Sequence, residues 1–294
     1  MKEAEKAVVR LSKDAMRALM PPREMDAHKG DFGRVIIFAG SKGMVGAAVL
    51  TALAAYRVGT GLVTVALDEE FFNIVQTCVP TATCKTVEDG LAGIAEYDAV
   101  AVGPGRGNNE STIRIVDKLL NRYEGKLVID ADALNCLPIM DSNYNARLRD
   151  AAADIVITPH VGEAKRLVGM PEDEEITREE LADRLYDHVM GTTLVMKGAP
   201  TIVKSSDVRY LNTSGNHGMA TGGSGDVLTG MITGFAGSGL DIPAASRLAV
   251  YVHGLAGNHA RKKFGSYSML ASDIVDCIPD AILNLMSVKE MIEE

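Results

Sequence analysis

The residues best suited to chemistry lie together in one glycine-rich stretch, Gly222-Gly223-Ser224-Gly225-Asp226, which a helix-like apolar segment follows at once. Glycine lets the backbone turn its N–H groups toward one point and lets a ligand come close. The first N–H groups of a helix have no partner within the helix, and the helix dipole is positive there. Residues 222–225 therefore predict an anion-binding site, most often one for phosphate.

Asp226 stands where that helix is expected to begin, and two roles are open for it. As an N-cap, its carboxylate would accept hydrogen bonds from the first backbone N–H groups. As a general base, it would take a proton from a hydroxyl that attacks the phosphate. An acid that only repelled the ligand would oppose the anion site. The base is therefore the favoured interpretation.

An α/β framework is predicted to position these residues. Apolar runs at residues 35–39, 62–66 and 98–102 are typical of buried parallel strands. The 29 glycines and the absence of tryptophan favour an α/β enzyme with many tight turns over a helical bundle. Further strands are expected within 127–135, 154–160, 193–201, 201–204 and 208–212. Helices are expected up to about 58, from about 111, from 162, after Thr177, and at 244–262 and 272–285.

Two more glycine loops follow strands, at residues 40–48 and at 103–107. The first has the spacing GxxGxxG and lacks GK[ST], so it matches neither a dinucleotide fingerprint nor a phosphate-binding P-loop. It is either a loop that a ligand approaches, with small Ala47 leaving room, or a tight turn with close helix packing. Gly105 and Gly107 lie in the second loop, where an open α/β sheet usually has its ligand crevice.

Polar residues also stand at the expected ends of strands. Asp130 and Asp132 suit either Mg²⁺ waters and a hydroxyl or ordinary turn and cap roles. His160 and Glu163 are three residues apart at a strand-to-helix junction, where both can face a ligand. Lys197 closes a strand beside a glycine, either to bind phosphate or an adenine edge or as an exposed strand-end lysine.

Composition narrows the class of protein. With 294 residues, 47% of them hydrophobic, the chain has enough apolar side chains for a sizeable core. No repeat or linker is found, so one domain over residues 1–294 is predicted, with about the first 25 as a helical lead-in. The net charge of −9 shows no basic excess and predicts neither a nucleic-acid nor a membrane partner. The charged N-terminus and the lack of a long apolar run predict a cytoplasmic protein.

Taken together, the motifs resemble a known family. Residues 223–226 are similar to the GAGD anion-hole signature of ribokinase-like kinases, and residues 158–163 look like the Asn-x-x-Glu segment of that superfamily. Six segments in order resemble the ADP-dependent NAD(P)H-hydrate dehydratases more closely, and six ordered motifs are more specific than any one. They lie at residues 28–48, 103–107, 128–135, 158–160, 197–201 and 216–226.

The resemblance implies a ribokinase-like three-layer αβα fold with a mostly parallel central sheet. It also implies a repair reaction, in which ADP phosphorylates the hydroxyl of hydrated NADH or NADPH and phosphate then leaves by elimination. By the same resemblance, Asp226 is the base and touches the hydrate. The remaining implied roles are hydrate binding by Ala47, Gly105 or Gly107, and His160; nucleotide binding by Lys197, Gly198, Ala199, Pro200, Thr201 and Gly225; and an anion hole at Gly222, Gly223, Ser224 and Gly225. Mg²⁺ is expected, with Glu163 as a candidate for organising its shell.

Departures from the sugar kinases also favour this branch, because Ala220 stands where those kinases usually have Asp and His160 replaces their Asn. Arg106 stands where the dehydratases often have Leu. Many bacterial members of the family carry an epimerase domain, for which this chain is too short, so a separate epimerase partner is expected. The apolar, small-residue helices near the C-terminus suggest a homo-oligomer, for which a tetramer is one option.

Three other functions remain open from sequence. A ribokinase-like kinase would use ATP on a small vitamin precursor or sugar and leave a stable phosphoester. A dehydrogenase built on the first βαβ unit would need a second redox substrate and would leave residues 222–226 without a role. A nucleotide sensor without catalysis would not need a base at Asp226. No residue of the sequence distinguishes ADP from ATP, or the NADH hydrate from the NADPH hydrate.

Overall fold

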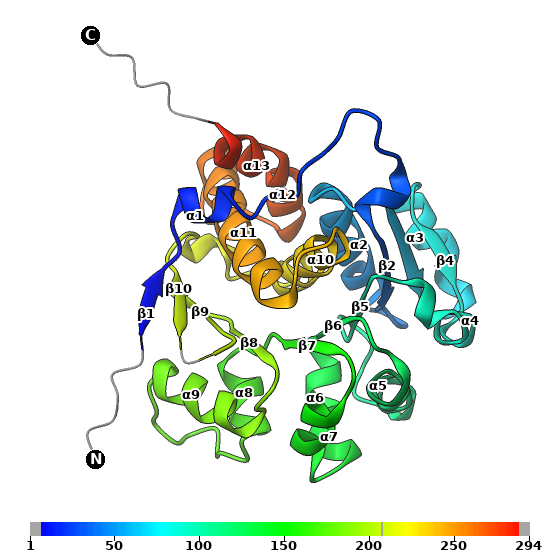
Figure 1. Ribbon diagram of the computed structural model, residues 1–294, viewed down its shortest axis with the longest axis vertical. Helices are drawn as coiled ribbons and strands as arrows, with labels where there is room; N and C mark the ends of the chain where they lie inside the picture. Colours follow the sequence, from blue (N-terminus) through cyan, green and yellow to red (C-terminus); the bar gives the residue numbers. More distant parts are fainter. Residues whose placement is uncertain (1–6, 207, 288–294) are drawn as a thin grey trace.

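A ten-stranded sheet forms the centre of the computed structural model, which describes residues 7–206 and 208–287 (Figure 1). In the order across the sheet, the strands are β1 (Val8–Arg10), β10 (Arg209–Asn212), β9 (Thr201–Lys204), β8 (Thr193–Met196), β7 (Asp154–Ile157), β6 (Lys126–Ile129), β5 (Ala99–Val102), β2 (Arg34–Phe38), β3 (Leu62–Ala66) and β4 (Thr83–Lys85). The strands from β8 to β4 are parallel, whereas β9 is antiparallel to both of its neighbours. The expected mostly parallel sheet is confirmed.

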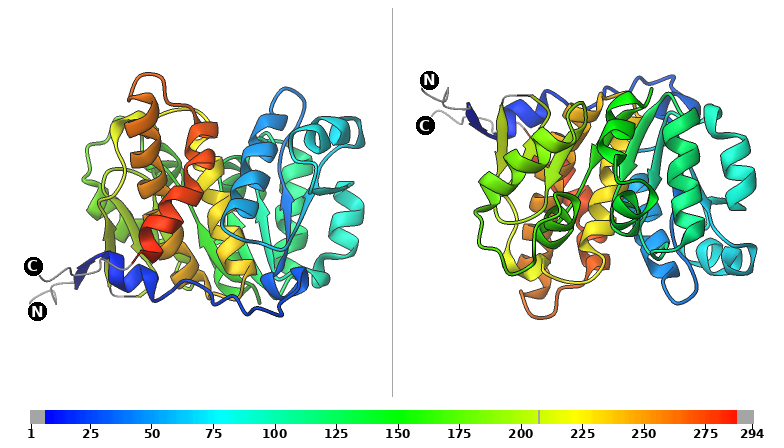
Figure 2. Two further views of the ribbon diagram at one scale, coloured as in Figure 1. Left: turned by 90° about the horizontal axis from the view of Figure 1, so that it is seen from above. Right: turned by 90° about the horizontal axis from the view of Figure 1, so that it is seen from below.

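Two hydrophobic cores lie on the two faces of this sheet, because alternate residues of each strand point to opposite sides. In β2, Val35 and Ile37 belong to one core, while Ile36 and Phe38 belong to the other. The first core is covered by α1 (Lys13–Arg17), α2 (Val45–Arg57), α3 (Phe72–Cys78), α10 (Ser224–Gly237), α11 (Ile242–Phe264), α12 (Ala271–Asp276) and α13 (Ile278–Met286). The second is covered by α4 (Val87–Ala92), α5 (Glu110–Arg122), α6 (Asp132–Met140), α7 (Tyr144–Asp150), α8 (Val161–Leu167) and α9 (Arg178–His188). Figure 2 shows these helix layers on either side of the sheet, which gives three layers.

Helix α10 packs unusually close to its neighbours because glycines recur along one side of it. A Cβ added at Gly230 would lie 2.1 Å from the carbonyl oxygen of Thr51 in α2. A Cβ at Gly237 would lie 2.4 Å from Val35 in β2. Only glycine permits such approaches, so the sequence of α10 places the helix, and the loop before it, against α2 and the sheet.

Several expected boundaries differ in the structure. Within residues 7–25 of the predicted helical lead-in, the helix is limited to the five residues of α1, and Val8–Arg10 adds an edge strand beside β10. The helix expected over residues 272–285 is two helices, α12 and α13, which meet at Cys277. The predicted N-cap at Thr177 is confirmed, since its hydroxyl accepts a hydrogen bond from the backbone N–H of Glu180. Residues 1–6 of the lead-in lie outside the described residues.

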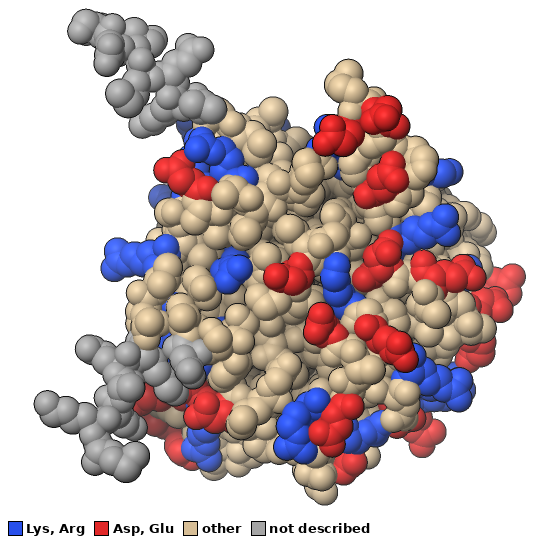
Figure 3. All heavy atoms as spheres, viewed as in Figure 1, with Lys and Arg blue, Asp and Glu red and all other residues tan. Residues whose placement is uncertain are grey.

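Charged side chains of both signs are interspersed on the face shown in Figure 3.

Within residues 7–206 and 208–287, none of the helices has the length and apolar character required to cross a bilayer.

Candidate active site

The glycine loop predicted from sequence leads directly into α10. Gly223 is the N-cap residue and adopts a left-handed conformation with φ of 91°. A Cβ there would lie 2.5 Å from Leu50, so both the conformation and the space require glycine. Ser224 begins the helix, and its hydroxyl oxygen lies 3.5 Å from Nε2 of His253 in α11. Burial lowers the pKa of His253 to about 4, so the ring beside the loop is neutral near pH 7.

Asp226 lies in the first turn of α10, and it is not the cap of that helix. The interpretation as a simple N-cap is therefore wrong, which leaves the carboxyl available for another role. Burial and, after it, the nearby carboxylate of Asp130 raise the pKa of Asp226 to about 7, although the ammonium of Lys197 acts in the opposite direction. A carboxyl with a pKa near physiological pH is suited to accept and return a proton.

Lys197 follows β8 and extends toward this loop. Its Nζ donates a hydrogen bond to Oδ1 of Asp130 (2.8 Å) and lies 3.7 Å from Oε2 of Glu163. A Cβ at Gly225 would lie 3.4 Å from the same Nζ. Burial lowers the pKa of Lys197, but Asp130, Glu163 and Asp226 outweigh that effect, so the pKa is raised and the side chain is charged. The interpretation as an exposed strand-end lysine is wrong, because the side chain is 21% exposed.

Asp130 connects Lys197 to α10. It follows β6, is 1% exposed, and accepts a second hydrogen bond at Oδ2 from the hydroxyl of Thr229 (2.6 Å). Burial raises its pKa, but Lys197 and the hydroxyl donors outweigh burial and hold the pKa of Asp130 below its ordinary value. The next residue, Ala131, has φ of 50°, which is uncommon outside glycine and marks backbone strain at the site.

Glu163 and His160 begin α8 and cap it reciprocally. The carboxylate of Glu163 accepts from the backbone N–H of His160 (2.8 Å), and Nδ1 of His160 accepts from the N–H groups of Gly162 and Glu163. The side chain of His160 is 54% exposed. Among the described residues, no three His, Cys, Asp or Glu side chains are grouped so that they could hold a metal ion. The described side chains thus form no metal centre by themselves.

The loops after β2 and β5 lie against each other, so three of the residues expected at the hydrate pocket, Ala47, Gly105 and Gly107, come together, whereas His160 lies apart in sequence at the start of α8. The backbone N–H of Gly40 donates to the carbonyl of Pro104 (2.8 Å). A Cβ at Gly105 would lie 2.9 Å from that of Ala47. The N–H of Gly107 donates to Oδ2 of Asp132 (2.7 Å), which joins this loop to the start of α6. Asp132 is the first residue of α6.

Arg106 points away from solvent in this pair of loops. It is 3% exposed and donates to the carbonyl of Gly40 (3.0 Å) and to the hydroxyl of Ser111 (3.2 Å). Burial lowers its pKa, while Asp68 and Glu88 act in the opposite direction. The guanidinium therefore holds the two loops together.

The expected nucleotide segment, residues 197–201, forms the turn between β8 and β9. Its peptide bond before Pro200 is cis, and Thr201 donates to the carbonyl of Gly198 (2.8 Å). Arg178 of α9 donates to the carbonyl of Ala199. Lys197 at the start of this turn contacts the centre of the site, and the rest of the turn lies beside α9.

Two contributors to this site, Thr229 and His253, are not among the residues predicted from sequence. Thr229 lies three residues after Asp226 in a helix, so it shares a face with that residue, and this spacing is a signal that points to it. His253 lies in α11, and no local pattern connects it to Ser224. Arg178 also contacts the predicted nucleotide segment, although it lies within the acidic stretch of residues 171–180, which predicts only a solvated surface.

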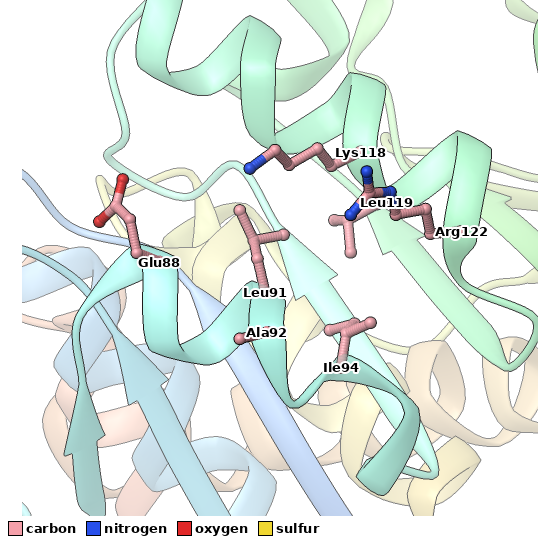
Figure 4. A pocket seen from close by; sticks show the side chains of 7 residues that line it. All are labelled: Glu88, Leu91, Ala92, Ile94, Lys118, Leu119 and Arg122. Carbon is pink, nitrogen blue, oxygen red and sulfur yellow. The ribbon is translucent and has the colours of Figure 1, made fainter.

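A separate pocket of about 190 Å³ lies between α4 and α5 and is lined by none of these residues (Figure 4). Leu91, Ala92, Ile94 and Leu119 form its apolar walls, and Lys118 and Arg122 flank it. It is not part of the site described above.

Comparison with known proteins agrees with this geometry. Residues 35–280 match the family model described as NAD(P)H-hydrate dehydratase, a span that contains every residue discussed at the site. The chain belongs to the NAD(P)H-hydrate dehydratase family. The resemblance expected from six ordered motifs is therefore confirmed.

Relatives from this family match most of the chain. The ADP-dependent (S)-NAD(P)H-hydrate dehydratase of Bacillus subtilis is 31% identical over 91% of this chain and 95% of its own length. A bifunctional NAD(P)H-hydrate repair enzyme of Moorella thermoacetica is 37% identical over 94% of this chain, but the chain spans 54% of that relative. The chain thus spans about half the length of the bifunctional relatives that it matches.

Solved structures of the dehydratase family support the fold. An ADP/ATP-dependent NAD(P)H-hydrate dehydratase from B. subtilis, co-crystallised with ATP and Mg²⁺, has a TM-score of 0.83 and 30% identity, and the match covers 96% of this chain and all of that one. Ribokinase from Thermotoga maritima has a TM-score of 0.53 and 11% identity, over 84% of this chain and 99% of that one, which shows shared fold alone. The ribokinase-like three-layer fold expected from sequence is confirmed.

Proposed function

We propose that this protein catalyses the ADP-dependent dehydration of (S)-NAD(P)H hydrate to NAD(P)H, with release of AMP and phosphate. The observation that carries the proposal is the carboxyl of Asp226, whose pKa is near 7, in the first turn of a glycine-capped helix and close to the Lys197 ammonium. In a member of this family, that arrangement supplies a base, a cation and an anion site together.

In the proposed first step, Asp226 takes the proton from the hydroxyl of the hydrate. The hydroxyl oxygen forms a bond to the β-phosphorus of ADP, and the bond from that phosphorus to the bridging oxygen breaks to release AMP. Lys197 and the N–H groups of residues 223–225 would stabilise the negative charge on the transferred phosphoryl group. In the second step, phosphate leaves with the electron pair of the carbon–oxygen bond, a ring proton is lost, and the double bond of NAD(P)H forms.

The binding roles follow the positions of the loops. Gly225 and residues 197–201 would hold ADP, with residues 222–225 as the anion hole for its phosphate. Ala47, Gly105 and Gly107 would line the hydrate pocket, because the loops after β2 and β5 meet there. His160, at the start of α8 after β7, would contribute a side chain to the same pocket.

Mg²⁺ is expected to enter with the nucleotide, as the co-crystallised B. subtilis relative suggests. Mg²⁺ usually keeps several waters and takes few carboxylate ligands, which suits a site without a cage of protein ligands. Glu163 is the candidate for orienting those waters. When bound, the ion would neutralise part of the phosphate charge.

We further infer a cytoplasmic, homo-oligomeric enzyme that works with an epimerase. Relatives named as bifunctional NAD(P)H-hydrate repair enzymes, of which this chain spans about half, support a second activity linked to this one.

The deciding experiment follows absorbance at the reduced-nicotinamide band after purified protein is mixed with Mg²⁺, hydrated NADH and either ADP or ATP. We expect a rise with ADP, and a loss of at least a hundredfold in rate for Asp226→Asn, as is typical when a general base is removed (about 10²–10⁴-fold). Asp150→Asn is the matched control, because Asp150 lies on α7 with a 69% exposed side chain.

Each other outcome has a definite meaning. A rise with ATP only would keep the reaction and overturn ADP as the donor. Full activity in Asp226→Asn would overturn the base. No rise with either nucleotide, from folded protein, would overturn the dehydratase proposal and favour a ribokinase-like kinase, which a stable phosphoester product would then establish.

A further inference from the structure

One buried carboxylate at the centre of the site has no part in the chemistry proposed above. Asp130 is 1% exposed and ionised, and its two oxygens accept hydrogen bonds from Lys197 Nζ (2.8 Å) and Thr229 Oγ1 (2.6 Å). Removing a carboxylate from water is unfavourable unless partners compensate, so a buried charge is weak support for stability alone. Its position beside the anion loop indicates a role in binding.

The partner that Asp130 holds is a flexible side chain. Lysine carries its ammonium on a four-carbon stem and can adopt many rotamers. Here the ammonium is fixed against the first turn of α10, 3.4 Å from where a Cβ of Gly225 would stand. Glu163 also attracts it, but at 3.7 Å it forms only a longer ion pair.

Thr229 completes the arrangement from the opposite side. Its hydroxyl belongs to α10, the same helix whose first turn borders the anion loop, and it binds the second oxygen of Asp130. Both oxygens of the carboxylate are thus held, one by the lysine that follows β8 and one by α10, and its orientation relative to that helix is set.

We propose that Asp130 is a positioning residue that holds the Lys197 ammonium beside the first turn of α10, so that this cation and the backbone N–H groups of the loop bind one phosphate group of a nucleoside diphosphate. The nature of the ligand rests on the proposed function. The role of Asp130 rests on the contacts above.

If Asp130 acted on the ligand only through its charge, its removal would have the opposite effect on ADP affinity. Asp130 carries a negative charge close to a phosphate site, and like charges repel. If Lys197 kept its place without Asp130, the variant Asp130→Asn would bind ADP more tightly than the wild type. If Asp130 positions Lys197, the same variant binds ADP more weakly.

The test is calorimetric titration of the full chain with ADP, for the wild type, Asp130→Asn, Lys197→Met and the double variant. We expect Asp130→Asn to weaken ADP binding roughly tenfold, the loss typical of one charge-assisted hydrogen bond. We expect the double variant to bind no more weakly than Lys197→Met, because Asp130 acts through Lys197. Unchanged or tighter binding by Asp130→Asn, or additive losses in the double variant, would overturn the proposal.

Thr229 provides a second series that is independent of whether Asp130→Asn folds. Thr229→Val removes the hydroxyl from Asp130 and leaves the carboxylate, whereas Thr229→Ser keeps the hydroxyl. We expect Thr229→Val to weaken ADP binding in the presence of Lys197 and to have no effect in the Lys197→Met background, while Thr229→Ser binds as the wild type does. Equal losses in both backgrounds would show that Thr229 acts only through the fold, and would overturn the proposal.

Binding and turnover separate this inference from the dehydratase proposal. A wild type that binds ADP, with the predicted variant pattern, but never restores the reduced-nicotinamide absorbance would overturn the dehydratase and support the role of Asp130. If the wild type turns over the hydrate but Asp130→Asn binds ADP with unchanged affinity, the dehydratase proposal is supported and the role of Asp130 is overturned.

Discussion

At the scale of single residues, the protonation of the two buried carboxyl groups at the site depends on which charged and polar groups lie next to each. Asp130 is ionised because Lys197 and two hydroxyl groups compensate its burial. Among the residues that the structure describes, Asp226 has no such set of partners, so burial and the charge of Asp130 raise its pKa to about 7. The two carboxyl groups therefore differ in their environments: Asp130 is the ionised partner of Lys197, and Asp226 can exchange a proton near neutral pH.

This difference predicts the pH dependence of the reaction. A base works in its unprotonated form, so kcat/KM should rise about tenfold per pH unit below pH 7 and level off above it. The measurement is kcat/KM for the hydrate from pH 5 to 9, at saturating ADP. The variant His160→Gln is the control and should keep the same acidic limb. If kcat/KM instead levelled off near pH 4, or if its rise with pH disappeared in His160→Gln, Asp226 would not be the base.

At the scale of elements, the close packing of helix α10 positions the glycine loop from which it begins. Its glycines permit backbone contact with α2 and β2, where any side chain would collide. The same helix supplies Thr229 to Asp130, so displacement of α10 would disturb the loop and the ion pair together.

Gly230→Ala should therefore destabilise the protein. The added Cβ would meet the carbonyl of Thr51 at 2.1 Å, and relief of such a clash requires backbone movement. We expect a loss of about 1–3 kcal/mol in the free energy of unfolding, measured by urea denaturation. Gly46→Ala in α2 is the matched control, because nothing lies within 4 Å of its added Cβ, and we expect it to be neutral or stabilising. Equal effects of both changes would refute the packing explanation.

At the scale of the whole molecule, the site depends on chain segments that are far apart in sequence. Lys197 and Asp130 are separated by 67 positions, and Thr229 and Asp130 by 99. These residues are brought together only when β6, β8 and α10 are in place, so a ligand of this site binds the folded chain and not the unfolded one.

Ligand binding should then stabilise the whole fold. At an ADP concentration about 100 times its dissociation constant, the free energy of unfolding should rise by about 2.7 kcal/mol. The measurement is urea denaturation of the wild type with and without ADP, and Lys197→Met at the same ADP concentration should gain less. A wild type whose unfolding midpoint does not respond to saturating ADP would contradict binding at an assembled site.

The sequence alone determined the features that depend on local order. The glycines at residues 222–225 and the acid after them predict an anion loop at the start of an apolar helix, because backbone freedom and helix dipoles are properties of consecutive residues. Apolar runs identified most of the parallel strands, and the order of six motifs identified the family. The edge strand Val8–Arg10 could not be predicted in this way, since three exposed residues carry no periodic pattern and form a strand only by pairing with β10.

Only the tertiary structure decided which charges meet. From sequence, Lys197 was open to an exposed position and Asp130 to a turn, and nothing connected them. Their pairing, the hydroxyl of Thr229 and the raised pKa of Asp226 all arise from burial and from contacts between distant segments. Desolvation and Coulomb interactions depend on distance and dielectric in space, which the order of residues along the chain does not contain.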